Sequence, residues 1–321
     1  MNPRRLRKSF RAGAALIVLA LVWAAPAYGL ELTVECSNPK AKIKTITQAL
    51  NIVSLISKAG PHTIHVSGAC NENVIIDGFD NLTLVANAGA SINDPTPSIP
   101  DDNDVVDIFN SQRITVQGFT INGGFDGLVC ALYSLCSLSN NTVQGASDVG
   151  IALGRGTRAN LTGNTIQNNS AGGIFATNVA EGVVAGGTIQ NNPGMGAYAF
   201  SASQLIFVNS GSGPVAIHDN GAEGVIAQGN STVVLAFDGA AVTMNAADGV
   251  LLVDASVARI GGNVQITGNG GNGVQLLESS FAFVGGSADL SGNGGSPVVC
   301  TGTFSNARAV GGNAGLSCHN P

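Results

Sequence analysis

Apolar and polar residues alternate along most of this chain in a pattern that returns every 23 to 28 residues. The stretch TIQNNSAGGIFA starts at residue 165, and TIQNNPGMGAYA starts 23 residues later, at residue 188. A fixed period in this range is typical of proteins built from stacked structural repeats. A glycine opens each apolar run, and these glycines are Gly127, Gly150, Gly173, Gly196, Gly224, Gly249 and Gly273.

Each repeat shows the two-residue alternation that is typical of strands. The first and third residues after each glycine are apolar, as in Ile151 and Leu153, and should point inward. A second apolar column precedes the glycine, where an inward residue such as Ile166 is followed by a polar one such as Gln167. This pattern predicts an all-β fold, a parallel β-helix of about ten coils stacked about 4.8 Å apart.

Asparagine recurs at one position of the repeat, three residues after the inward Ile or Val. This residue tolerates the backbone of a sharp corner, and stacked amides can hydrogen-bond from coil to coil. We therefore predict a ladder at one corner of the coil, because six equivalents in a row favour a role in geometry over one in catalysis. The predicted ladder consists of Asn169, Asn192, Asn220, Asn245, Asn269 and Asn293.

Three segments depart from the repeat. Residues 45–58 predict an amphipathic helix that ends at Gly60-Pro61 and caps the open core and unpaired strand edge of the first coil. Residues 87–104 contain three prolines and four aspartates and predict a loop inserted into the barrel. Residues 300–321 are predicted to cap the far end. The apolar positions of the helix are Ile46, Leu50, Val53 and Ile56.

The Asn-rich corners, the runs GVLLV and GVQLL, and the opening TITQALNIVSLISKAGPHTIHVSGAC resemble the pectin-lyase-like superfamily over about residues 43 to 316. The resemblance implies a right-handed parallel β-helix with an N-terminal capping helix. Enzymes of that superfamily generally carry charged residues on one outward strand face, often with bound calcium. The Asn-Thr-Asp, Asp-Asp, Gly-His-Gly and Arg-Ile-Lys series of polygalacturonases is not matched here, so the resemblance carries no catalytic residue across.

The first 29 residues predict a signal peptide, because a basic start precedes an apolar stretch of signal length. The remaining residues 30–321 form one predicted domain that is secreted or periplasmic, without a later apolar run long enough to span a bilayer. Cysteines should then form disulfides, although six cysteines allow fifteen connectivities. A metal site is the weaker alternative, because no Cys-x-x-Cys with a nearby His occurs. Proximity in sequence suggests the pairs Cys36–Cys70, Cys130–Cys136 and Cys300–Cys318.

Loss of the signal would leave nine basic residues against 20 acidic ones, a net charge of −11. Such a surface repels nucleic acid, and it repels anionic polysaccharide unless a cation mediates the contact. We expect the protein to be a monomer whose partners are neutral glycans or cell-surface proteins. We expect no cofactor, with calcium only under an enzymatic alternative.

Two groups of residues are candidates for a site. His65, Asp107 and Asp126 could form a small acid/base or calcium site on the early coils, or simply a solvated polar patch. The aromatic residues Phe175, Tyr198 and Phe200 should lie outside the barrel, where they could stack on sugar rings. Four more apolar residues extend this predicted patch, unless residues 210–214 fold over it; they are Ile226, Leu251, Val253 and Leu277.

His218, Asp219 and Glu223 form a third polar group, which fits the outward polar column and a corner better than a proton-transfer site. The outward positions after each repeat glycine, from Val129 to Leu277, carry no charge, whereas glycoside hydrolysis requires two carboxylates. The leading hypothesis is therefore an exported β-helix scaffold that binds glycans or cell-surface partners without a catalytic centre. The alternative is a divergent polysaccharide lyase, hydrolase or epimerase that acts through the early acidic region.

Overall fold

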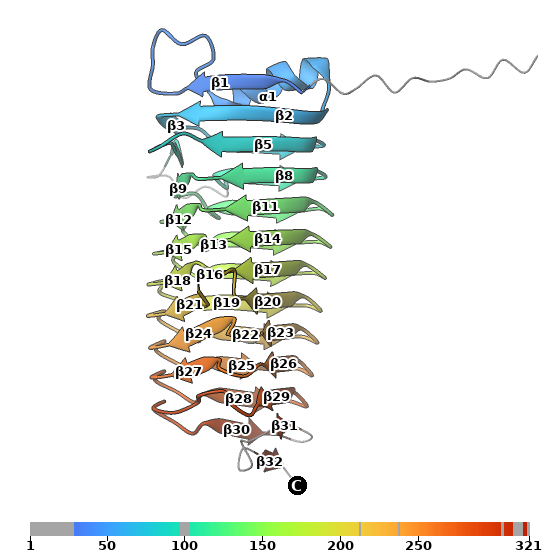
Figure 1. Ribbon diagram of the computed structural model, residues 1–321, viewed down its shortest axis with the longest axis vertical. Coiled ribbons are helices and arrows are strands. Elements are labelled where there is room, and N and C mark those ends of the chain that lie inside the picture. The colour runs from blue at the N-terminus through green and yellow to red at the C-terminus, as the bar shows by residue number, and fades with distance from the viewer. Residues whose placement is uncertain are drawn as a thin grey trace, which may run out of the picture.

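The chain winds into a right-handed parallel β-helix, a rod of stacked coils that runs from the N-terminal to the C-terminal end (Figure 1). This computed structural model describes residues 29–96, 103–211, 213–236, 238–302, 305–310 and 317–319. The predicted signal peptide lies outside the described residues, apart from Gly29. Within them, no helix is both long and apolar enough to cross a membrane.

Each regular coil contributes one strand to each of three sheets, which we call A, B and C. Sheet A contains β1 (Glu31–Glu35), β2 (Ala59–Ser67), β5 (Asp80–Ala86), β8 (Gln112–Gln117), β11 (Leu135–Ser139), β14 (Arg158–Thr162), β17 (Glu181–Ala185), β20 (Gln204–Val208), β23 (Thr232–Leu235), β26 (Val257–Ile260), β29 (Phe281–Gly285), β31 (Asn306–Val310) and β32 (Ser317–His319). Sheet B contains β3 (Ala69–Asn71), β6 (Ser91–Asn93), β9 (Thr120–Asn122), β12 (Thr142–Gln144), β15 (Thr165–Gln167), β18 (Thr188–Gln190), β21 (Val215–His218), β24 (Ala240–Thr243) and β27 (Gln265–Thr267). Sheet C contains β4 (Val74–Asp77), β7 (Val106–Phe109), β10 (Leu128–Ala131), β13 (Val149–Gly154), β16 (Gly172–Thr177), β19 (Met195–Phe200), β22 (Val225–Gln228), β25 (Val250–Leu252), β28 (Val274–Leu277) and β30 (Val298–Thr301).

The core confirms the predicted alternation. Ile151 and Leu153 of β13 are fully buried, whereas Ala152 between them faces outward. Strands of successive coils pair in parallel, so each inward residue stacks on its counterpart, as Ile151 does on Ile174. Fully burying a side chain of this size stabilises the fold by about 1.5–3 kcal/mol. Stacking therefore extends one continuous core along the rod.

The predicted asparagine ladder is present, and five of its six members are buried, while Asn293 at its end is half-buried. The amide oxygen of Asn192 accepts hydrogen bonds from the backbone N–H of Asn169 at 2.9 Å and from its side-chain amide at 3.1 Å. The side-chain amide of Asn192 donates to the oxygen of Asn220 at 2.9 Å, and the same pattern continues to Asn293. One detail was predicted wrongly: the left-handed residue is the one before the ladder residue, as in Asn168 and Asn191.

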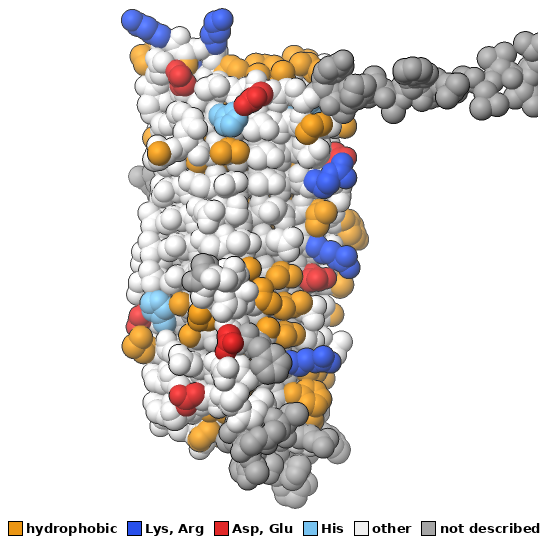
Figure 2. Space-filling model, viewed as in Figure 1, with side chains coloured by type: hydrophobic (Ala, Val, Ile, Leu, Met, Phe, Trp, Pro, Cys, Tyr) orange, Lys and Arg blue, Asp and Glu red, His pale blue; other side chains and the backbone are white. Residues whose placement is uncertain are grey.

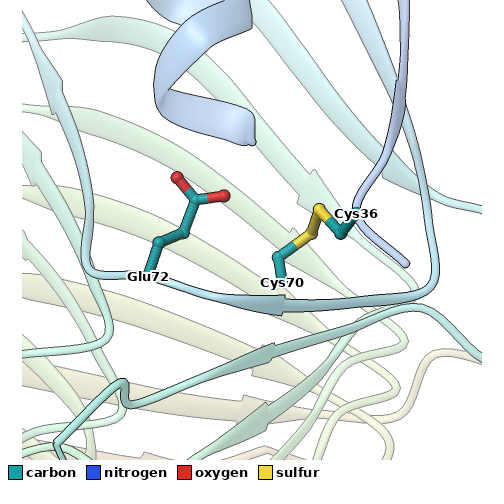
Figure 3. Close-up of side chains that lie close together, drawn as sticks. All are labelled: Cys36, Cys70 and Glu72. Carbon is teal, nitrogen blue, oxygen red and sulfur yellow. A yellow bond between two sulfur atoms is a disulfide. The ribbon is translucent and has the colours of Figure 1, made fainter. Parts of the chain in front are cut away.

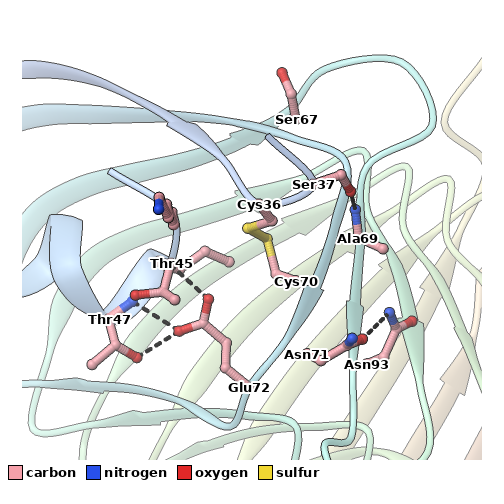
Figure 4. Close-up of a disulfide and its surroundings, with 12 residues drawn as sticks. Cys36, Ser37, Thr45, Thr47, Ser67, Ala69, Cys70, Asn71, Glu72 and Asn93 are labelled. Carbon is pink, nitrogen blue, oxygen red and sulfur yellow. Dashed lines mark hydrogen bonds between the residues drawn. A yellow bond between two sulfur atoms is a disulfide. The ribbon is translucent and has the colours of Figure 1, made fainter. Parts of the chain in front are cut away.

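A single helix, α1 (Ile46–Ile56), caps the N-terminal end of the rod, as predicted. Its first turn contains no acidic residue, and Glu72 from the first coil takes that role (Figure 4). The Glu72 carboxylate accepts hydrogen bonds from the backbone N–H groups of Ile46 at 2.7 Å and Thr47 at 3.0 Å, and from the Thr47 hydroxyl at 2.7 Å. A carboxylate at this position satisfies orphan donors and complements the helix dipole.

Two details of the cap differ from the prediction. Ile56 is 65% exposed, and Ala49 instead joins Ile46, Leu50 and Val53 in the buried face, because the last turn of α1 extends past the rim of the barrel. Gly60 and Pro61 do not end the helix. The helix ends before Ser57, and both residues lie within β2.

One predicted segment differs, and the predicted C-terminal cap lies only partly within the described residues. Residues 87–104 are not one ejected loop, because Ser91–Asn93 form β6 and pair with sheet B; residues 97–102 lie outside the described part. At the C-terminal end, β32 pairs with β31 in an antiparallel sense, whereas every other strand pairing in the three sheets is parallel. The C-terminal edge of sheet A is therefore a strand of only three residues.

The structure joins Cys36 to Cys70, with the Cα atoms 5.0 Å apart, and Cys130 to Cys136, with the Cα atoms 6.7 Å apart. These are two of the three predicted pairs. Cys300 is also disulfide-bonded; Cys318 belongs to β32, whose side chains lie outside the described part. The first disulfide fastens the segment between β1 and α1 to the first coil (Figure 3).

Candidate functional site

The outer face of sheet C brings the acidic and aromatic candidates onto one surface. Parallel register places Asp107 of β7 beside Val129 of β10, which lies beside Ala152 of β13. The same file then continues through Phe175 of β16 to Tyr198 of β19. The carboxyl group of Asp107 therefore lies on the same strip as the rings, three coils before the first of them.

Phe175, Tyr198 and Phe200 form an aromatic cluster. The ring centroids of Phe175 and Tyr198 lie 5.2 Å apart, and those of Tyr198 and Phe200 lie 5.8 Å apart. The Tyr198 hydroxyl donates a hydrogen bond to Gln228, whose amide donates to Asp254 at 2.9 Å. Burial, and next the charge of Asp254, raise the pKa of the Tyr198 phenol. These contacts hold the central ring in place while the cluster stays partly exposed.

The predicted extension of this patch is less exposed than the alternation alone implies. Ile226 is 8% exposed, and Leu251, Val253 and Leu277 are half-buried, because outward side chains of adjacent coils cover one another. The described residues of the insertion, 210, 211, 213 and 214, do not cover the patch. The insertion joins β20 of sheet A to β21 of sheet B, at the corner away from sheet C, and Gly211 and Gly213 border open space.

Four carboxyl groups gather on the early coils at the edge of sheet C. Asp104 Oδ1 accepts a hydrogen bond from the backbone N–H of Asp126 at 2.9 Å, and Asp126 Oδ1 accepts one from the N–H of Val149 at 3.1 Å. Asp107 Oδ1 is buried without a hydrogen-bond partner. Asp148 completes the group through its charge interaction with Asp104 and Asp126.

Three of these carboxyls, those of Asp107, Asp126 and Asp148, have raised pKa values. Burial raises the pKa of Asp107 to about 7, and a hydrogen bond and charge from Asp104, then the charge of Asp126, act in the same direction. Burial also raises the pKa of Asp126 to about 7, against the lowering effect of the Val149 hydrogen bond. The pKa of Asp148 is raised by burial and then by Asp104. Both protonated and ionised carboxyls are therefore available near neutral pH.

A hollow of about 410 Å³ connects the acidic group to the aromatic cluster. Asp126 and Asp148 line one part of it, and Phe175, Thr177 and Asn178 line another. Arg155 adds a cation to the same lining. A volume of this size, with charged, hydrogen-bonding and aromatic groups, suits a polar small molecule or one unit of a polymer.

The predicted trio of His65, Asp107 and Asp126 is not assembled, since only the two aspartates lie together. His65 belongs to β2 of sheet A, where its Nε2 lies 2.9 Å from Glu31 Oε1. Alternation predicted correctly that His65 faces outward, but it could not say on which of the three faces. His218 lies on sheet B, and its Nδ1 lies 2.6 Å from Asp219 Oδ2.

Cys36, Cys70 and Glu72 place three donor atoms of the kinds that bind metals within 4.8 Å of one another (Figure 3). The two sulfur atoms are bonded to each other, and the carboxylate is occupied by the N-terminus of α1. This group therefore serves the cap in its disulfide form, and its chemistry does not extend the site on sheet C.

Sequence reasoning missed a second hollow, of about 630 Å³, on the outer face of sheet A. Its lining includes Val234, Arg259 and Phe283, which follow one another in register on β23, β26 and β29. Hydrophobic side chains gather in the lower half of this face in Figure 2. A signal was present in the sequence, because apolar residues occupy the same file in the two coils before Val234, Val183 two coils earlier and Ile206 one coil earlier.

Proteins of known structure share the fold of this chain. A family model described as "Right handed beta helix region" matches residues 45–212 and 126–314. The fold is similar to that of pectate lyase Pel9A, with a TM-score of 0.56 and 12% identity over 84% of this chain and 79% of that one. It is also similar to the A-module of mannuronan C-5 epimerase AlgE4 of Azotobacter vinelandii, with a TM-score of 0.53 and 16% identity over 74% of this chain and 70% of that one. No curated protein matched the sequence. At these identities the likeness shows a shared fold.

Proposed function

Because the chain belongs to the family of right-handed β-helix proteins, and one outer face of its rod joins an aromatic cluster to a polar hollow, we propose that it binds a glycan on sheet C. Phe175, Tyr198 and Phe200 form the sugar platform in this proposal. The observation that carries it is their contact across two adjacent coils, with ring centroids 5.2 and 5.8 Å apart.

The chemistry of the face fits a sugar chain. Aromatic rings offer apolar faces to the C–H groups of a pyranose, while the hydroxyls of the sugar need hydrogen-bonding groups at the rim. Thr177 and Asn178 supply such groups in the hollow next to Phe175. Export of the protein, which its disulfides favour, would bring this face to extracellular or periplasmic glycans.

Charge narrows the class of glycan. The net charge of the whole chain is −6, and Asp126 and Asp148 line the hollow beside the platform. An anionic polysaccharide would meet repulsion there, whereas a neutral oligosaccharide would not. A neutral glycan is therefore the proposed ligand.

The test is a glycan array followed by calorimetric titration with the best neutral oligosaccharide. Tyr198→Ala should weaken binding by roughly tenfold to a hundredfold, the range expected for removing a ring worth about 1.4–3 kcal/mol. Phe283→Ala is the matched control, because it removes a partly exposed ring on sheet A. Equal affinity of the wild-type protein and Tyr198→Ala would reject the platform.

A second candidate function rests on the raised pKa values of Asp107 and Asp126. Near pH 7 a protonated carboxyl can donate its proton to a glycosidic oxygen as the bond to the anomeric carbon breaks, while an ionised carboxylate assists the attack of water. Assays for reducing sugar and for unsaturated uronate separate this hydrolase from a lyase. Turnover that disappears in Asp107→Asn would favour catalysis, and binding without turnover would favour the scaffold.

A further inference from the structure

The hollow on sheet A differs in character from the glycan face. Val234 is half-buried there, and Phe283 is 38% exposed, with its ring packed edge-on against Phe281 at a centroid distance of 4.5 Å. Buried Leu235 and Ile260 also reach its lining. Four of the lining residues lack a side chain: Gly261, Gly262, Gly285 and Gly286. The result is an open, mainly apolar recess about 630 Å³ in volume.

Among the described side chains that line this recess, Arg259 is the cation. The Arg259 side chain is exposed and makes no ion pair or side-chain hydrogen bond with another described residue. Two other arginines on the outer face of sheet A differ, while Arg308 of β31, which follows Phe283 in register, has its side chain outside the described part. Arg113 lies 2.6 Å from Asp80, and Arg158 lies 3.4 Å from Glu181. Arg259 thus has no carboxylate partner among the described residues and lies beside apolar surface, in a chain that is acidic as a whole.

We propose that this recess binds a single-chain apolar carboxylate of the fatty-acid class. The alkyl chain would lie against Val234 and Phe283, and the carboxylate would pair with the guanidinium of Arg259. The volume lies within the range of small-molecule sites, which are mostly apolar with a few polar groups that fix orientation. A guanidinium matches a carboxylate with two parallel hydrogen bonds, which supplies the orientation.

The proposal is independent of the glycan site. Val234, Arg259 and Phe283 belong to sheet A, whereas Phe175 and Tyr198 belong to sheet C, on another face of the rod. Failure of one proposal therefore leaves the other intact. Tyr198→Ala should have no effect on fatty-acid binding, just as Phe283→Ala should have none on the glycan.

The experiment compares laurate with dodecanol, which has the same alkyl chain without the charge, by calorimetric titration below the micelle concentration. Laurate should bind the full-length protein at one site. Arg259→Gln should lower the affinity for laurate by roughly tenfold or more, as expected for a lost charge-assisted pair, and leave the affinity for dodecanol unchanged. Phe283→Ala should lower the affinity for both ligands.

Arg158→Gln is the matched control, because it neutralises another arginine on sheet A that already has a carboxylate partner. Circular dichroism of each variant checks that the rod is folded. Absence of saturable laurate binding by the folded wild-type protein would overturn the proposal. The proposal is also overturned if Arg259→Gln binds laurate with the affinity of the wild-type protein, or if phosphatidylglycerol vesicles bind at this face and laurate does not.

Discussion

Replacing Asn192 by alanine tests the ladder at the middle of the rod. The side chain of Asn192 accepts from the buried backbone N–H of Asn169 at 2.9 Å and donates to Asn220 at 2.9 Å and to the Ile166 carbonyl at 3.3 Å. The alanine variant would leave the N–H of Asn169 unpaired in a fully buried position. An unsatisfied buried donor costs about 1–3 kcal/mol, and the bonds that Asn192 donates add about 1 kcal/mol more.

We therefore expect the free energy of unfolding to fall by roughly 2–4 kcal/mol, measured by urea denaturation with far-ultraviolet circular dichroism. Gln190→Ala is the control, because that neighbouring amide lies outside the barrel and donates one partly exposed bond, to Gln167 at 2.8 Å. Its loss should cost no more than about 1 kcal/mol. If the two variants lose equal stability, the ladder is not a source of buried hydrogen-bond energy and the reasoning fails.

Two further predictions concern carboxyl groups. Glu72→Gln should weaken the attachment of α1 by about 1–2 kcal/mol, because the neutral amide has one acceptor oxygen and no charge, whereas the carboxylate accepts three hydrogen bonds. Faster amide hydrogen exchange confined to α1 would verify this prediction, and unchanged exchange would contradict it. The pKa of Asp126 is raised from 3.8 to about 7, so the folded state keeps a proton that the unfolded state releases between these values. Its contribution to stability is therefore greatest at low pH and is lost as pH rises from about 4 through 7. Asp126→Asn should flatten this part of the stability profile and stabilise the protein at pH 8, and a wild-type profile in the variant would refute the assignment.

Much of the fold could be predicted because a β-helix repeats the same local physics. Inward positions such as Ile151 and corner residues such as Asn169 are specified by alternation and period, and both are where the sequence pattern placed them. The capping helix followed from helical spacing, but Ile56 was misplaced. Spacing cannot show where the barrel rim ends, and only the three-dimensional packing of α1 decides that.

The candidate site was predicted in part for the same reason. Alternation tells inside from outside, and it placed Phe175 and Tyr198 together because their coils have equal length. It could not tell sheet A from sheet C on the early coils, where β6 was hidden inside a supposed loop, and so His65 was grouped with Asp107. The hollow beside Arg259 was missed because it depends on the absence of side chains at glycines in two successive coils.

The reversed strand β32 has a consequence for how long the molecule can be. A stack of parallel coils has no intrinsic end, since the last coil offers the same hydrogen-bonding template as every coil before it. The edge that β32 leaves on sheet A is only three residues long, and Glu31 and Glu35 place charge along the edge strand at the other end. Short and charged edge strands are poor templates for further pairing. Both ends of sheet A therefore disfavour growth into a fibre, and ligands on different faces would be held at set heights along one rod.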